Sequence, residues 1–415
     1  MSAPEQDRTG ARARVAPTSD RPRRGPLARL RGRTPAYLLR FAALQLYDRV
    51  DAGRLLFPLH EGDLADSQHL SPHEVHPAPA RPRIGWVVHP PSAGSGGHTT
   101  LFRMIASAVG AGFDCTLLLY NRHDGDVDYY RQVIRHAWPW LDVRIEAAAE
   151  RIIGFDALVA SSWSTAHVIA SRAPEGRRLY FIQDYEPFFS PRGSEHAFAQ
   201  DSYRLGFRNI ALGEMVHELL RDELGVASDL VPFGCDTEAY ELADPQPERR
   251  GIAWYAKRGN DRRGYRHATR ALELFHERLP EEPIHVYGDV VADVRFPVVN
   301  HGNMTPNALS DLYNGVIAGL ALSFTNVSLV PEEMLACGAI PVVNEDRYAR
   351  MVLDNPQVVW ADATPAALAD ALVAAVAHPR RVERAAAAAA SVRGRSWEPT
   401  GEAFVRVLAD ELTRS

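Results

Sequence analysis

The chain has 415 residues, of which 46% are hydrophobic and 24% charged, as is typical of a soluble globular protein. This length exceeds one ordinary core, so two domains are expected. The apolar runs are too short to span a membrane, and the N-terminal sequence does not resemble a signal peptide. Three scattered cysteines, Cys115, Cys235 and Cys337, lack metal-site spacing. They argue against a zinc site or a disulfide framework and favour a reducing cytoplasm.

Charge is unevenly distributed along the chain. The net charge is −6, but residues 1–40 hold ten arginines and three acidic residues, about +7, which leaves about −13 for the rest. Residues 1–33 have almost no apolar side chains, so they are predicted to form a disordered Arg-rich arm. Such an arm can touch anionic lipid or nucleic acid, or remain a solvated tail.

The segment after the arm, residues 34–82, is predicted to contain one helix and a linker. Apolar residues at helical spacing, including Leu38, Phe41 and Leu44, indicate a helix within residues 34–57. Residues 58–82 carry several Pro and His residues and are predicted to form the linker.

Residues 83–240 show apolar strands alternating with helices, which predicts a parallel sheet with helices on both faces. A helix is expected at about 99–109. The expected strands are 83–89, 114–120, 155–162, 178–186, 209–215 and 228–234.

The same alternation restarts after an acidic, Pro-containing break at 235–251, and it predicts a second domain over residues 249–395. Residues 396–415 are expected to form a terminal helix after an Ala-rich helical region. Ligands are expected in a cleft at the carboxyl ends of the strands of these two doubly wound halves. The expected elements of the second half are strands at 252–257, 284–289, 319–324 and 339–343 and helices at 265–279 and 307–316.

A short helix between the last two of these strands carries the main candidate site. Pro331 suits its first position, Glu332 and Glu333 its first turn, and Gly338 its left-handed end. The two glutamates lie about 100° apart around a helix, so both cannot face one ligand. One carboxylate could accept hydrogen bonds from a sugar hydroxyl, or both could merely stabilise the helix start.

Backbone amides at this helix start, including those of Leu329 and Val330, could bind phosphate oxygens. A basic loop at 255–265 places Lys257 together with Arg258, Arg262 and Arg263 after a strand. Clustered cations at a strand end suit a diphosphate. The alternative is an exposed charged loop.

A glycine-rich turn at residues 94–97 lies between a strand and a helix. Gly94 and Gly96 match two glycines of the dinucleotide-binding fingerprint, but Thr99 replaces the third. Asp114 stands at the near end of the second strand, although a ribose-binding acid belongs at the far end. The pattern therefore disfavours a nicotinamide site, and leaves a backbone cradle for phosphate at Gly96 and Gly97.

Acceptor-side candidates follow a strand of the first half. Asp184, Tyr185 and Glu186 are expected at the cleft edge, where a carboxylate could orient or deprotonate an acceptor hydroxyl. Either acid could instead fix a turn. His89 and His98 are expected near the same edge, and each alone is more often structural.

Asp126, Val127 and Asp128 form an Asp-x-Asp triplet of the kind that holds a divalent metal in sugar transferases of another fold. The triplet is short and lies in a polar loop, so chance explains it and no metal is expected. His-Glu-x-x-His and P-loop motifs do not occur in the sequence.

Residues 83–412, with the glycine turn, the basic loop and the sequence 333–343, resemble glycosyltransferase family 4. Members have the GT-B fold, an α/β architecture of two Rossmann-like, doubly wound parallel-sheet domains facing a cleft. The resemblance implies that Glu333 binds the donor ribose. A second family glutamate, eight residues earlier, is Thr325 here. This departure, with 180–191 and 255–265, looks like the WsaF-type rhamnosyltransferases.

That likeness implies dTDP-L-rhamnose as donor, Asp184 as the acceptor-side carboxylate, and Lys257 and Arg263 as a phosphate clamp. Asp184, Lys257 and Glu333 are then the catalytic candidates, and Trp397 starts a helix that crosses back to the first domain. The expected protein is a cytoplasmic, cofactor- and metal-independent retaining glycosyltransferase acting on a lipid-linked glycan.

The Arg-rich arm could contact the inner membrane face or remain a solvated tail, and no nucleic-acid partner is expected. The alternatives are a nucleotide-sugar 2-epimerase of the same fold, a non-catalytic nucleotide-sugar binder, and a dinucleotide oxidoreductase.

Overall fold

The computed structural model describes residues 34–50, 56–123, 125–327 and 329–414. The chain divides into two compact units, residues 1–58 and 59–415. In the first unit, α1 (Pro35–Arg49) confirms that a helix follows the Arg-rich segment. The predicted arm at 1–33 lies outside the described residues.

The first sheet of the second unit is parallel and seven-stranded, with the order β3-β2-β1-β4-β5-β6-β7. β2 and β3 are added on one side of β1, and β4 to β7 on the other side. This reversal of strand order is the arrangement of a doubly wound sheet. The six predicted strands are confirmed, whereas β3 was missed because it has one buried residue, Ile145. The strands are β1 (Arg83–Val88), β2 (Asp114–Leu119), β3 (Arg144–Ala147), β4 (Ala157–Ala160), β5 (Arg177–Ile182), β6 (Arg208–Leu212) and β7 (Asp229–Val231).

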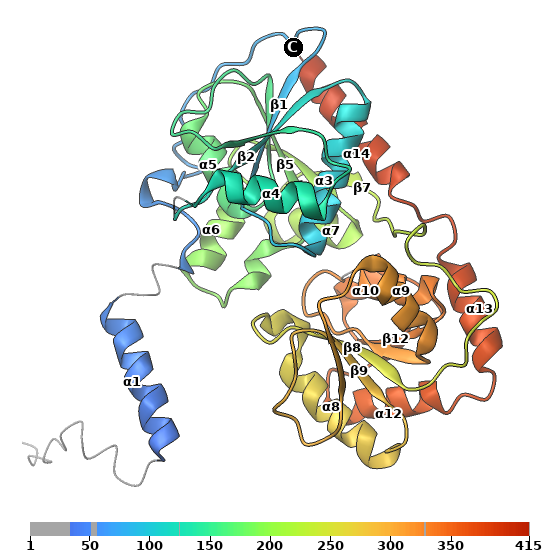
Figure 1. Ribbon diagram of the computed structural model, residues 1–415. Helices are drawn as coiled ribbons and strands as arrows, with labels where there is room; N and C mark the ends of the chain where they lie inside the picture. The colour runs from blue at the N-terminus through green and yellow to red at the C-terminus, as the bar shows by residue number, and fades with distance from the viewer. Residues whose placement is uncertain (1–33, 51–55, 124, 328, 415) are drawn as a thin grey trace, which may run out of the picture. The chain divides into compact units, whose positions relative to one another are not determined.

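Helices cover both faces of this sheet (Figure 1). The predicted helix at 99–109 is α3, which begins earlier, at Gly96. These helices are α3 (Gly96–Gly110), α4 (Val127–Ala137), α5 (Trp163–Arg172), α6 (Ser194–Ser202) and α7 (Glu214–Leu224).

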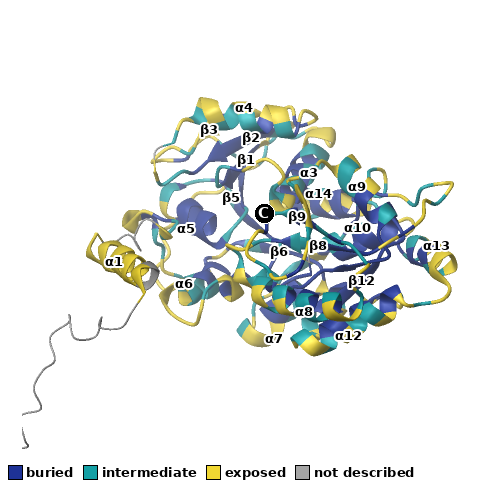
Figure 2. Ribbon diagram, turned by 60° about the horizontal axis from the view of Figure 1, so that its bottom comes forward, coloured by how far each residue is buried: buried dark blue, intermediate teal, exposed yellow. Residues whose placement is uncertain are grey.

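The second sheet is parallel and six-stranded, with the order β10-β9-β8-β11-β12-β13, and reverses between β8 and β11. In Figure 2 the strands of both sheets are mostly dark blue, the colour of buried residues. They are buried because helices cover both faces of each sheet. The elements are β8 (Ile252–Ala256), α8 (Tyr265–Arg278), β9 (Ile284–Gly288), β10 (Val299–Gly302), α9 (Pro306–Gly315), β11 (Ala318–Leu320), α10 (Val330–Ala336), β12 (Ile340–Asn344), α11 (Arg347–Val352), β13 (Val359–Ala361), α12 (Pro365–Val376) and α13 (Arg381–Ser391).

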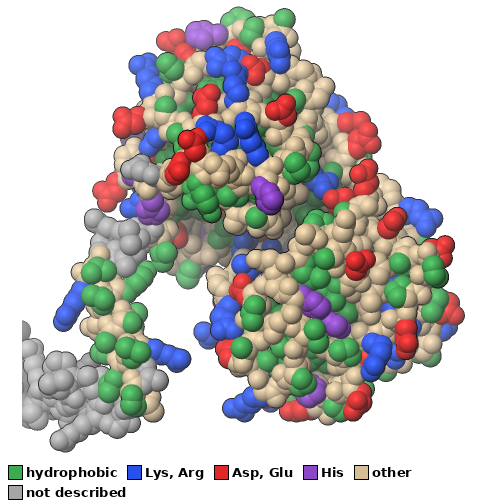
Figure 3. Space-filling view, in the orientation of Figure 1, with side chains coloured by type: hydrophobic (Ala, Val, Ile, Leu, Met, Phe, Trp, Pro, Cys, Tyr) green, Lys and Arg blue, Asp and Glu red, His purple; other side chains and the backbone are tan. Residues whose placement is uncertain are grey.

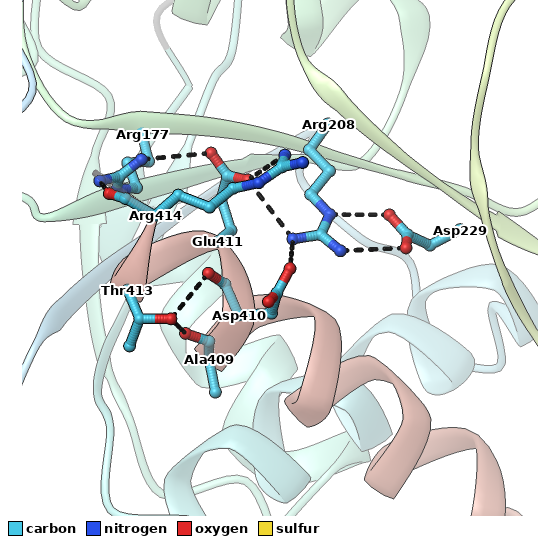
Figure 4. Close-up of polar contacts among 8 residues, drawn as sticks. All are labelled: Arg177, Arg208, Asp229, Ala409, Asp410, Glu411, Thr413 and Arg414. Atoms are coloured by element: carbon cyan, nitrogen blue, oxygen red, sulfur yellow. Dashed lines mark hydrogen bonds and ion pairs between the residues drawn. The ribbon is translucent and has the colours of Figure 1, made fainter.

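The terminal helix α14 (Glu398–Thr413) returns to the first sheet, with Trp397 at its N-cap. Phe404 packs against Trp86 and Phe181, with ring centroids 5.2 and 5.5 Å apart. At its C-terminal end, Glu411 pairs with Arg177 and Arg208 of two neighbouring strands (Figure 4). The chain's last helix is thus part of the first half's core.

The chain crosses between the two halves twice, and the two crossings lie side by side. The amide of Cys235 donates a 2.6 Å hydrogen bond to the carbonyl of Arg395. A Cβ at Gly234 would lie 2.9 Å from backbone atoms of Ser396 and Trp397, so only glycine fits there.

Candidate functional site

Asp184 joins the two halves at the carboxyl ends of their sheets. Its carboxylate follows β5 and is 9% exposed. It accepts hydrogen bonds from Arg262 Nη1 (3.0 Å), Thr325 Oγ1 (2.9 Å) and the amide of Asn326 (3.0 Å). Asn326 also donates its side-chain Nδ2 to the carbonyl of Gln183, at 2.8 Å. Three hydrogen bonds therefore fasten the loop after β5 to the loop after β11, and Arg262 of the basic loop adds a further bond to Asp184.

The loop after β11 is itself fixed by the next strand. Ser323 and Asn344 exchange two hydrogen bonds of 2.8 Å, from the Ser323 amide to Asn344 Oδ1 and from Asn344 Nδ2 to the Ser323 carbonyl. Ser323 Oγ donates to the carbonyl of Asn326, at 2.7 Å. Thr325, only 2% exposed, is thereby held in place opposite Asp184.

Three cations of the basic loop, Lys257, Arg258 and Arg262, form ion pairs with carboxylates. Arg262 pairs with Asp184 and places its guanidinium 3.8 Å from the ring centroid of Phe189. Arg258 is exposed and pairs with Asp293. Lys257 Nζ lies 3.4 Å from Asp289 Oδ1.

Arg263 is the cation of this loop without a carboxylate partner among the described residues. It donates to Ser323 Oγ at 3.1 Å, and no carboxylate within the described ranges forms an ion pair with it. Burial is the main cause that lowers its pKa, and the neighbouring charge of Arg262 acts in the same direction. A partly buried guanidinium in this position lacks an anion, which a diphosphate would supply.

The two glutamates of α10 diverge, as the helix geometry requires. Glu332 is buried and pairs with Arg395 of the chain crossing at 2.9 Å, so contact of Glu332 with the donor stays a prediction. Glu333 is partly exposed and forms no hydrogen bond or ion pair with other residues that the structure describes. Burial, with the nearby charge of Asp236, raises the pKa of Glu333 to about 8, while Arg103 acts to lower it. Glu333 thus remains the candidate for a ligand hydroxyl.

Arg103 of α3 and Asp236 pair with each other beside Glu333. Sequence reasoning missed both. Neither belongs to a motif, and only the fold brings α3 and the chain crossing together.

The glycine turn lies at the start of α3, near the loop after β5. A Cβ on Gly97 would stand 3.8 Å from Gln183 Oε1, and one on Gly96 would meet no atom within 4 Å. The space in front of Gly96 is therefore open for a ligand. Gly94 has φ of +80°, which favours glycine.

His98 and His89 form a hydrogen-bonded pair behind this turn. His98 Nδ1 lies 2.8 Å from Ser95 Oγ and its Nε2 lies 3.1 Å from the carbonyl of His89. His89 Nε2 lies 2.6 Å from Ser164 Oγ. Burial lowers the pKa of His89 to about 4 and also lowers that of His98, so both rings are neutral at neutral pH. These contacts fix the orientation of both rings, and the acceptor-side role of His98 stays a prediction.

Glu186 was predicted at the cleft edge, but the structure places it elsewhere. Its carboxylate is buried inside the first half, where it accepts hydrogen bonds from the amide of Trp163 (2.9 Å) and the hydroxyl of Tyr180 (2.8 Å). Burial raises the pKa of Glu186 to about 7. Tyr185, by contrast, lines a pocket of about 480 Å³ beside Thr325.

The Asp-x-Asp triplet has a local structural role. Asp126 caps α4 by accepting a 2.8 Å hydrogen bond from the amide of Asp128. Across the described ranges, no cluster of three His, Cys, Asp or Glu side chains suits a metal ion. Within the same ranges, no helix combines the length and the apolar character needed to cross a membrane.

Part of the second half is similar to a known protein family. Residues 250–373 match the family model "WsaF, C-terminal domain", as the resemblance implied. A curated relative, the O-antigen biosynthesis protein RfbC of Myxococcus xanthus, is 30% identical over 254 residues. The match covers 59% of this chain and 20% of that protein, so the chain spans about a fifth of its relative's length.

Solved structures show the same fold. Sucrose-phosphate synthase from Thermosynechococcus elongatus has a TM-score of 0.61 at 12% identity, over 81% of this chain and 100% of its own. HepE of Anabaena, in complex with UDP and glucose, has a TM-score of 0.57 at 12% identity. The match covers 81% of this chain and 100% of HepE. WaaG, a glycosyltransferase involved in lipopolysaccharide biosynthesis, has a TM-score of 0.52 at 14% identity. The match covers 80% of this chain and 100% of WaaG. The predicted GT-B fold is confirmed.

Proposed function

We propose, on the premise that residues 250–373 are a WsaF C-terminal domain within a GT-B fold, that this protein is a glycosyltransferase of polysaccharide assembly. It transfers a sugar from a nucleotide-sugar donor to a hydroxyl of a growing glycan. The observation that carries the proposal is Arg263, a partly buried cation with no carboxylate partner among the described residues, inside the matched segment. Lys257 lies in the same loop, and the carboxyl of Glu333, in the same half, forms no hydrogen bond or ion pair with other described residues.

The chemistry needs positive charge where the donor breaks. As the bond between sugar and diphosphate opens, negative charge develops on the leaving oxygen, and Lys257 and Arg263 stabilise it by direct contact. This arrangement requires no metal. The ribose hydroxyls then hydrogen-bond to Glu333.

The donor is dTDP-L-rhamnose, transferred with retention of configuration. The WsaF likeness supports this choice, as does Thr325 at the position where the family carries a sugar-contacting glutamate. A 6-deoxy sugar has one hydroxyl fewer to bind, so this position needs no carboxylate.

The acceptor is a glycan on a lipid carrier at the cytoplasmic membrane. The printed name of the relative, an O-antigen biosynthesis protein, supports a polysaccharide acceptor. The Arg-rich segment 1–33 would reach anionic lipid headgroups. On the face seen in Figure 3, Lys and Arg side chains are interspersed with acidic ones, so no nucleic-acid partner is proposed.

A transfer assay tests the proposal. The full chain is incubated with dTDP-L-rhamnose labelled in the sugar and with lipid-linked glycan extracted from the producing cells. Label entering the lipid fraction supports transfer. An altered sugar formed without acceptor would identify a 2-epimerase, and nucleotide binding with no turnover would identify a binding protein. Sedimentation with anionic vesicles tests the arm, and equal pelleting with and without residues 1–33 would remove its membrane role.

A further inference from the structure

The pocket of about 480 Å³ beside Thr325 has walls from both halves of the second unit. The first half contributes the segment after β5, α6 and α7, and the second half contributes the loops after β11 and β12. The residues proposed for the donor diphosphate and ribose, Lys257, Arg263 and Glu333, do not line it, whereas Thr325 does. The pocket is thus distinct from the nucleotide site, yet it adjoins the position proposed for the transferred sugar.

Two aromatic rings, one from each half, are left open to this pocket. Phe188 is 40% exposed and Phe324 is 39% exposed. Phe188 is oriented by Tyr185, whose ring meets it edge-on at 4.8 Å, and Phe324 packs at 5.4 Å from His267. Large apolar side chains that remain exposed in a concave site indicate a ligand with an apolar surface.

The polar residues of the pocket narrow the class of that ligand. The lining includes Arg192 and two carboxylates, Glu223 and Asp346, so it is not a cationic site for a phosphate. Gln200 adds a planar amide, anchored by a 3.0 Å hydrogen bond from its Nε2 to the hydroxyl of Tyr185. Planar guanidinium, carboxylate and amide groups can each bond two neighbouring hydroxyls.

We propose that this pocket binds a sugar ring of the acceptor glycan, with Phe188 and Phe324 packing on the apolar faces of the ring. A neutral sugar combines C–H faces for the aromatic rings with hydroxyls for Arg192, Gln200 and Asp346. The inference rests on the proposed glycosyl transfer and adds where the acceptor lies. Because the walls come from both halves, the pocket is complete only when the Asp184–Thr325 contact holds them together.

The test measures binding of neutral glycosides to the full chain. Methyl glycosides of L-rhamnose, D-mannose, D-glucose and N-acetylglucosamine are titrated by ligand-detected NMR, with and without dTDP. The variants are Phe188→Ala, Phe324→Ala and Arg192→Ala, each checked for an unchanged melting temperature. Tyr129→Ala is the matched control, since Tyr129 is an exposed aromatic residue outside the pocket.

The proposal predicts that at least one glycoside binds, that dTDP does not displace it, and that the pocket variants weaken binding about tenfold or more. Tyr129→Ala leaves binding unchanged. Absence of glycoside binding while dTDP still binds would overturn the acceptor pocket and leave the proposed function standing. Displacement by dTDP would also overturn it, because the glycoside would then occupy the donor site. If the unmutated chain binds no dTDP at all, this result would instead count against the proposed function.

Discussion

Asp184 and Thr325, 141 positions apart in the sequence, share a 2.9 Å hydrogen bond that joins the two sheets of the GT-B fold. Asp184 was predicted as an acceptor-side carboxylate and Thr325 as a donor-side residue. Their direct contact places the two predicted sides of the reaction next to each other. Both oxygens of the Asp184 carboxylate accept hydrogen bonds, Oδ2 from Arg262 and Thr325 and Oδ1 from the amide of Asn326.

Replacement Asp184→Asn places an amide NH2 or a neutral oxygen where the charged group now accepts hydrogen bonds. We expect the free energy of unfolding to fall by about 1–3 kcal/mol, the range for a buried group left without a partner. Transfer should drop more than tenfold while dTDP binding stays near normal. Denaturant unfolding and the transfer assay measure the two effects.

The control is Asp229→Asn, which removes the same charge from an ion pair with Arg208 far along the first sheet (Figure 4). It should leave turnover unchanged. Normal turnover in Asp184→Asn would remove Asp184 from the reaction.

Lys257→Ala and Arg263→Ala should each weaken dTDP binding by about 10- to 100-fold. A hydrogen bond to a charged group contributes about 1.5–3 kcal/mol, and 1.4 kcal/mol corresponds to a factor of ten. Arg258→Ala is the matched control, because Arg258 is exposed and pairs with Asp293. Isothermal titration gives the three affinities, and equal losses in all three variants would mean that only general charge matters.

Thr325→Glu introduces the residue that glycosyltransferase family 4, which this chain resembles, carries at this position. The side chain is 2% exposed and bonded to Asp184, so a second carboxylate would be forced against the first. Transfer from dTDP-L-rhamnose should fall strongly, and Thr325→Gln separates the effect of charge from that of size. Full activity of Thr325→Glu with this donor would contradict the role given to Thr325.

Glu333 should make stability depend on pH. Its pKa is raised from 4.5 to about 8 in the folded state, mainly by burial, so the native state holds a proton that the unfolded chain loses above pH 4.5. This contribution to stability is complete below pH 4.5 and is lost as the pH rises to about 8. The melting temperature of the wild type, minus that of Glu333→Gln, should therefore decrease between pH 5 and 8.5.

Glu186, with a pKa of about 7, titrates in both proteins and cancels in this difference. A difference that is constant across the pH range would contradict the raised pKa of Glu333.

The sequence predicted the fold well because long apolar runs at strand positions have few alternatives. Strands such as β1 and β12, buried along nearly their whole length, were found with boundaries within one residue. Gly338 has the left-handed φ, +80°, that its place after a helix predicted. The edge strands β3 and β10 were missed because their side chains are mostly exposed and carry no periodic signal.

The candidate site was predicted less completely, since side-chain partners depend on the packing of distant segments. Glu332 and Glu186 occupy positions that local pattern favours for a ligand, yet Arg395 binds one and the first half's core encloses the other. The Arg395 ion pair exists only because two chain crossings lie together, which no local window of sequence can reveal.

A thermal-shift panel on the full chain tests which nucleotide the protein binds. The ligands are dTDP-L-rhamnose, dTDP-glucose, UDP-sugars, GDP-mannose and NAD, each with and without EDTA, because a ligand that binds the native state raises its melting temperature. We expect a shift with dTDP compounds that EDTA does not change. A shift with UDP- or GDP-sugars alone would overturn the rhamnose donor, and a shift with NAD alone would contradict a glycosyltransferase altogether.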